Sequence, residues 1–167
     1  MPPTPPRAVT QSATVHHGRV SVPLLPAGRW RLWLPPDWPF GEPPFATAVG
    51  LEWVSRQPGH PCSYGLLGGH LTGTGEAAIT APVAGDPFPG SLAGRAEEVR
   101  TGLPDEYRPV VLAATDNRPL VITTAAHGLV GSCALVFHRL TTVLADILEG
   151  RIEPTTVAAT TAWAAFR

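Results

Sequence analysis

The stretch LVITTAAHGLVGSCALVFHRLTTVLADILEG occupies residues 120–150 and contains the two clearest elements of the chain. Residues 120–124 form an apolar, β-branched run, which is typical of a strand. Residues 133–148 place apolar side chains at helical spacing, which predicts an amphipathic helix with one apolar face. We expect Ser132 to cap the start of this helix and Gly150 to mark its end. A strand followed by a long amphipathic helix favours a domain in which helices cover a sheet.

Alternating patterns before this stretch predict further strands, because successive strand side chains point to opposite faces. We expect a hairpin formed by residues 13–23 and 29–34 with its turn at 26–28, and strands at 46–56, 64–72 and 76–83. Ser91 is placed to cap a helix at 92–100, residues 104–114 continue as helix or extended chain, and 154–166 has a helical pattern rich in threonine. The predicted fold is α+β: a mixed, largely antiparallel sheet with two main helices on one face, plus an N-terminal hairpin.

The distribution of prolines and aromatic residues predicts the domain organisation. Residues 1–12 are rich in proline and poor in bulky apolar side chains, which predicts a disordered tail. Residues 13–167 predict a single α+β domain: 13–45 supply the hairpin and a connector rich in proline and tryptophan, 46–150 the core, and 151–167 a C-terminal helix. The aromatic residues of 29–44 either form a lid over the sheet or anchor a partner, and we favour the lid.

The composition excludes several classes of function. The net charge is −1, so no global field draws the chain to nucleic acid or anionic lipid. The absence of lysine excludes a Schiff-base mechanism and the lysine-containing phosphate loop of a GTPase. No secretion signal is visible, and no apolar run approaches the roughly 20 residues of a membrane helix. We therefore expect a cytoplasmic protein with no membrane partner and with Cys62 and Cys133 as free thiols.

Two short motifs resemble the fourth domain of elongation factor G. The stretch LPDEYRPVV at residues 103–111 is similar to that domain's I-P-x-E-Y-x-P-x-V, and HGLVGSCALVF at 127–137 is similar to its H-x-V-D-S-S-x-x-A-F. A third stretch, QPGHPCSYG at 57–65, is similar to its Q-S-G-G-x-G-Q-Y-G loop. The resemblance covers about residues 46–150 and implies the ribosomal protein S5 second-domain-like fold. We expect Tyr107 and Phe137, one from each longer motif, to be buried in the same core.

The resemblance also implies where the chain binds. In the family, the loops that correspond to Gly59–Gly65 and Ala126–Ser132 lie side by side at the tip of the domain, which reaches into the ribosome. The chain departs from the family at Gly131, where the family has aspartate, and at Cys133, where it has a second serine. The implied function is that of a non-catalytic binding protein associated with a ribosome, RNA or another protein, without a cofactor. The implied binding residues are Gly59, His60, Ser63, Tyr64, His127 and Ser132.

Cys133 and His127 offer an alternative from another class of function. A cysteine at a helix start with a histidine nearby is the arrangement of a small cysteine-dependent hydrolase or acyltransferase. We favour a capping-turn role for Cys133 instead, because apolar neighbours raise the pKa of a thiol. His60, Cys62 and His70 are of metal-binding types, but their spacing matches no closed zinc pattern, and we predict no metal site.

Overall fold

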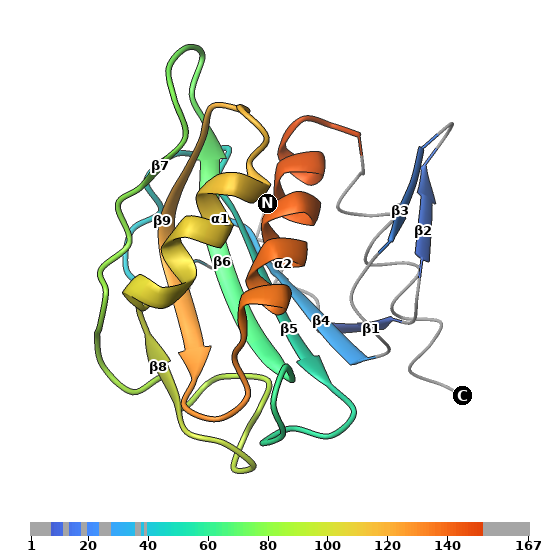
Figure 1. Ribbon diagram of the computed structural model, residues 1–167, viewed down its shortest axis with the longest axis vertical. Helices are drawn as coiled ribbons and strands as arrows, with labels where there is room; N and C mark the ends of the chain where they lie inside the picture. The colour runs from blue at the N-terminus through green and yellow to red at the C-terminus, as the bar shows by residue number, and fades with distance from the viewer. Residues whose placement is uncertain are drawn as a thin grey trace, which may run out of the picture.

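The computed structural model describes residues 8–11, 14–17, 20–23, 28–35, 38 and 40–151, with the strands before residue 28 described by their backbone alone. The described chain is an α+β fold in which one sheet is covered by helices (Figure 1). The predicted fold class is therefore confirmed at this level. The predicted C-terminal helix at 154–166 lies outside the described residues.

The main sheet is mixed and mostly antiparallel, as predicted. Every neighbouring pair of its strands is antiparallel except β7 and β9, which run parallel. In the described part of the chain it has seven strands. In order across the sheet these are β1 (Ala8–Gln11), β4 (Gly28–Trp33), β5 (Val49–Ser55), β6 (Tyr64–Leu71), β9 (Leu120–Gly128) and β7 (Ala78–Ile79), with β8 (Val99–Thr101) also paired to β9.

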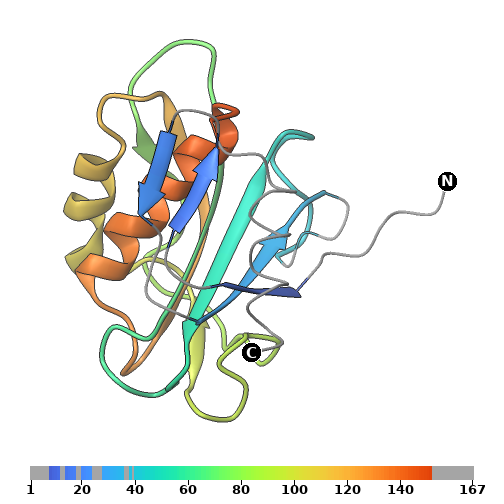
Figure 2. The same ribbon diagram turned by 90° about the vertical axis from the view of Figure 1, so that its right-hand side faces the viewer.

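Two helices cover one face of the sheet, as Figures 1 and 2 show. The longer is α2 (Ala134–Leu148), and α1 (Arg108–Ala114) follows the short 3-10 helix η1 (Asp105–Tyr107). The apolar stripe of α2 packs on β5 and β6, where Gly65 lets the side chains of Val136 and Leu140 approach the strand closely. Phe137 is fully buried in this core, as predicted. Tyr107 packs against it, with ring centroids 4.9 Å apart, but is only partly buried.

Loops rather than helices cover the other face of the sheet. Trp38 is buried there and lies over Gly68, where a β-carbon would stand 3.0 Å from its ring. Phe40 packs against Phe88, with ring centroids 5.0 Å apart. A second, smaller core includes Val54, Tyr64, Leu66 and Ala126 beneath these loops. Trp38 and Phe40 therefore cover this face as the predicted lid, whereas Trp30 is buried in the helix-side core.

The predicted N-terminal hairpin is wrong in its pairing. Residues Thr14–His17 (β2) pair with Val20–Pro23 (β3) in a separate two-stranded sheet. Strand β4 pairs instead with β5 on one side and with β1 on the other, and β1 lies within the range expected to be a tail. An alternating pattern identifies a strand but does not identify the strand that it pairs with. Strand β4 pairs with the apolar strand β5, where Trp30 and Leu32 are buried.

Three local predictions also fail. Residues 92–100 do not form a helix: turns occupy residues 91–97, where Gly94 has a φ of +58°, and the chain then enters β8. The N-cap position of α2 is Cys133, without a side-chain cap, whereas Ser132 bonds elsewhere. The strand predicted at 76–83 is reduced to the two residues of β7.

Candidate functional site

Three loops meet at the end of the sheet where β5 ends and β6 begins, and we call residues 56–63, 91–98 and 128–135 the tip. The amides of Ser63 and Tyr64 both donate to the carbonyl of Gly131, at 2.6 and 3.1 Å. The loop 91–98 packs against the loop 56–63. A β-carbon on Gly59 would stand 2.9 Å from the carbonyl oxygen of Ala96. The prediction that the loops Gly59–Gly65 and Ala126–Ser132 lie side by side is confirmed.

A disulfide between Cys62 and Cys133 joins two of these loops, with 5.0 Å between the α-carbons. The expectation of free thiols is therefore wrong. It was drawn from the expected cytoplasmic setting, and the disulfide argues against that setting, because disulfides persist mainly in oxidising compartments. Cys62 has a φ of 57°, a left-handed conformation that costs a non-glycine residue roughly 1–2 kcal/mol. The disulfide to Cys133 and the hydrogen bond that the Ser63 amide donates to the carbonyl of Gly131 hold this turn in place.

The loop 128–133 is also fixed by side chains from two other segments. Ser132 Oγ accepts from the amide of Gly128 at 2.9 Å and donates to the carbonyl of Tyr64 at 2.8 Å. Glu97 Oε1 accepts from the amides of Val130, at 2.7 Å, and Gly131. A β-carbon at Gly131 would meet the Glu97 carboxylate, so any larger residue there would require this side chain to shift.

The tip presents large apolar side chains to solvent. Leu129 is 56% exposed, Val130 58% and Leu135 52%, which makes them three of the most exposed large apolar residues described. Arg56 and Arg95 are exposed at the same end, and neither forms an ion pair with another described residue. The tip therefore combines apolar contact area with cationic groups on a cross-linked backbone.

The predicted binding residues have different places in this tip. His60 is exposed, and Gly59 and Ser132 are partly buried. Ser63 and Tyr64 are buried and hold the loops from beneath. His127 is partly buried on β9, where its Nδ1 lies 3.0 Å from the carbonyl oxygen of Gly102. Most of these residues thus shape the tip, and the apolar side chains of Leu129, Val130 and Leu135, which the motifs did not single out, form its surface.

The predicted cysteine–histidine pair has no thiol to react. Cys133 Sγ is bonded to Cys62, and a disulfide sulfur carries no titrating proton. The His60, Cys62 and His70 set is also separated, because His70 lies near the far end of β6, roughly 20 Å from Tyr64 at the tip. Among the described residues, no three histidine, cysteine, aspartate or glutamate side chains gather as a metal site.

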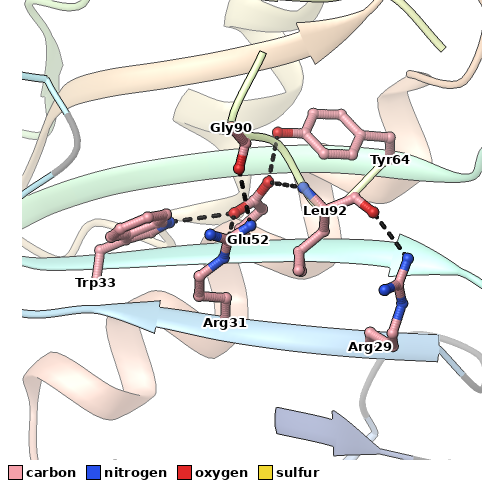
Figure 3. Close-up of polar contacts among 7 residues, drawn as sticks. All are labelled: Arg29, Arg31, Trp33, Glu52, Tyr64, Gly90 and Leu92. Carbon is pink, nitrogen blue, oxygen red and sulfur yellow. Dashed lines mark hydrogen bonds and ion pairs between the residues drawn. The ribbon is translucent and has the colours of Figure 1, made fainter. Parts of the chain in front are cut away.

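A buried carboxylate lies beside the tip on the loop-covered face (Figure 3). Glu52 on β5 is fully buried, and its Oε1 accepts from the hydroxyl of Tyr64 at 2.9 Å and the amide of Leu92 at 2.7 Å. Its Oε2 accepts from Trp33 Nε1 at 3.2 Å and lies 3.1 Å from Arg31 Nε, an ion pair rather than an aligned hydrogen bond.

Burial dominates the ionisation of this cluster. It raises the pKa of Glu52 above 4.5, although Arg31 and the hydrogen bonds oppose the shift. Burial, followed by the nearby Glu52 charge, raises the pKa of Tyr64 well above 10.0. Arg31 and Arg29 also donate to the carbonyls of Gly90 and Leu92, at 3.0 and 2.8 Å (Figure 3). With no exposed surface, the carboxylate serves to fasten the loop 90–92 onto the sheet.

Comparison with known proteins gives no relative: no family model, no curated protein and no solved structure matches the chain. Neither α1 nor α2 has the length and apolar character needed to cross a bilayer, within the part of the chain that the structure describes.

Proposed function

We propose that the chain is a non-catalytic binding protein that resembles a detached fourth domain of elongation factor G, with the ribosomal protein S5 second-domain-like fold, and docks on a ribosome through its tip. The observation that carries this proposal is the exposure of Leu129 and Val130 on a loop whose backbone is tied by a disulfide, Glu97 and Ser132.

The rigidity of the tip supports a role in binding. A loop that is ordered before it meets a partner loses less conformational entropy on docking, so more of the contact energy appears as affinity. Exposed leucine and valine side chains gain by leaving water, at about 25 cal/mol per Å² of apolar surface.

The charged residues of the tip support an RNA-rich partner. Arg56 and Arg95 are exposed and unpaired with described residues, which leaves their guanidinium groups free for phosphate contacts. The overall charge of −1 gives no general attraction to RNA, so any association depends on this local arrangement. Docking on a ribosome implies a cytoplasmic setting, and the alternative within the same proposal is docking on a protein partner.

Cosedimentation with purified ribosomes tests the proposal. The oxidised protein should pellet with ribosomes through a sucrose cushion, and Leu129→Ser with Val130→Ser should reduce the bound fraction about tenfold or more, as expected for two apolar anchors. Leu112→Ser is the matched control, because Leu112 is 42% exposed but lies on α1, away from the tip. Equal pelleting of the tip variant and the wild type would contradict docking through the tip.

The cysteine-dependent enzyme is the competing proposal, and it requires reduction of the Cys62–Cys133 bond. Alkylation of the reduced protein at varied pH measures the acidity of the Cys133 thiol. A pKa near or above 8.5, the usual value for a cysteine, agrees with the structural role. Fast labelling below about pH 7 that His127→Ala abolishes would instead favour the enzyme, since it would identify a histidine-activated thiolate.

A further inference from the structure

A cavity opens on the loop-covered face of the sheet, and no tip residue lines it. Its volume is about 490 Å³, within the range of small-molecule sites. Its floor is formed by β8 and β9, and its walls by the loop 82–88 and by Phe40 of the connector. None of the motifs discussed above lies in it.

A β-bulge shapes the floor of this cavity. Gly68 pairs with Thr124 and Gly69 with Ile122, so Thr123 is the extra residue of β9. Ile122 and Ala125 both point into the helix-side core, which leaves Thr123 and Thr124 together on the opposite face. Their hydroxyl oxygens lie 3.3 Å apart. Bulges of this kind redirect side chains next to binding sites.

The paired hydroxyls retain hydrogen-bonding capacity toward the cavity. One of the two hydroxyls donates to the other. The accepting hydroxyl can still donate its own proton, and both oxygens still have a lone pair that can accept a hydrogen bond. Thr101 lines the cavity beside them. The floor therefore offers several hydroxyl groups within one small area.

The walls give the cavity its selectivity. Asp86 lines it and is exposed, and its carboxylate forms no ion pair with any residue that the structure describes. Phe40 and Phe88 form a partly buried aromatic pair on the wall. No basic side chain is among the described lining residues. A carboxylate, hydroxyls and aromatic rings attract a cation and disfavour an anion.

We propose that this cavity binds a small organic cation that carries a protonated amine on a planar apolar group. The amine pairs with Asp86 and donates to the threonine hydroxyls, and the planar group packs on Phe40 and Phe88. This site shares no residue with the tip, so its test does not depend on the proposed ribosome docking.

Calorimetric titration with 2-phenylethylamine tests the site on the oxidised, full-length chain. Its partner probe is 3-phenylpropanoate, which has similar size and opposite charge. The amine should bind with a Kd of about 1 mM or tighter, whereas the carboxylate should show no heat of binding. Asp86→Asn should weaken amine binding about tenfold or more, because a charge-assisted hydrogen bond is lost.

Two further variants separate the site from general effects. Thr123→Val keeps the shape of the bulge residue and removes its hydroxyl, and should weaken amine binding measurably. Asp116→Asn removes an exposed carboxylate in the turn before β9, outside the cavity, and should leave binding unchanged. The proposal is overturned if the amine fails to bind, if both probes bind equally, or if Asp86→Asn binds the amine as the wild type does.

Discussion

Breaking the Cys62–Cys133 bond should destabilise the protein by about 4 kcal/mol. The bond closes a loop of 71 residues, and in the chain-entropy model a closed loop of that length lowers the entropy of the unfolded chain by this amount at 25 °C. The native contacts should largely survive, because the same loops are also joined by the Ser63 amide and the Glu97 carboxylate. The effect should therefore appear mainly through the unfolded state.

Urea unfolding of four proteins measures this effect. The oxidised wild type is compared with its reduced form, with Cys62→Ser, with Cys133→Ser and with the double variant. Each change that breaks the bond should lower the free energy of unfolding by a similar amount, and the double variant should lose no more than either single one, since one bond is lost in all cases.

The reductant supplies the internal control. It should destabilise the wild type and leave the double variant unchanged. A loss below about 1 kcal/mol on reduction, where about 4 is expected, would refute the inference that this bond constrains a long loop of the unfolded chain. A loss in the double variant on adding reductant would show that the reagent acts elsewhere.

Three further predictions follow from single buried side chains. Glu52→Ala should lower the free energy of unfolding by about 3 kcal/mol in urea. Because the pKa of Glu52 is raised in the fold, its protonated form stabilises the native state, and this contribution is lost as the group ionises. The cost of Glu52→Ala should therefore shrink as pH rises above 4.5, and a cost that grows with pH would contradict this. Burial lowers the pKa of His70 below 6.5, so stability should fall as pH drops through 6.5, and His70→Gln but not the exposed His60→Gln should remove that fall in thermal unfolding. Phe137→Ala should cost about 3–5 kcal/mol, and Tyr107→Ala less because its ring is only partly buried; equal losses would contradict this packing.

The elements with strong periodicity could be predicted from the sequence. Helix α2 and strand β9 lie where their patterns indicated, because each must bury one apolar face and few other arrangements do so. The register of β9 was harder to predict. The pair Gly68–Gly69 weakened the strand pattern of β6, and the structure shows why: a β-carbon on Gly69 would stand 2.1 Å from the Val121 carbonyl oxygen. The glycines were thus a local signal of the bulge.

Strand pairing and loop structure could not be read from local patterns. The turn residues between β3 and β4 fit a hairpin, but β4 takes its partners from distant parts of the chain. Residues 92–100 have helical spacing, yet the amide of Leu92 is bonded to Glu52, forty residues earlier. Tertiary contacts of this kind override local propensity.

The candidate site shows the same division. The resemblance brought the two tip loops together correctly, since their strands are neighbours in the sheet. The disulfide was not foreseen, because two cysteines 71 residues apart pair only when the fold brings them close. Glu97 carries no local signal of its role. Glu52 did carry one, as a lone acid in the apolar strand β5, and such a residue requires buried partners.

One loop connects the two proposed sites. Asp86 and Phe88 line the cavity, and Glu97 lies at the tip, with Leu92 between them in sequence. The amide of Leu92 is held by Glu52, and its carbonyl is held by Arg29. The buried carboxylate thus fastens the loop at a point between the cavity and the tip. A charged group in the interior is costly unless its partners compensate it, and here the compensation also positions the residues of two surfaces that Glu52 itself does not reach.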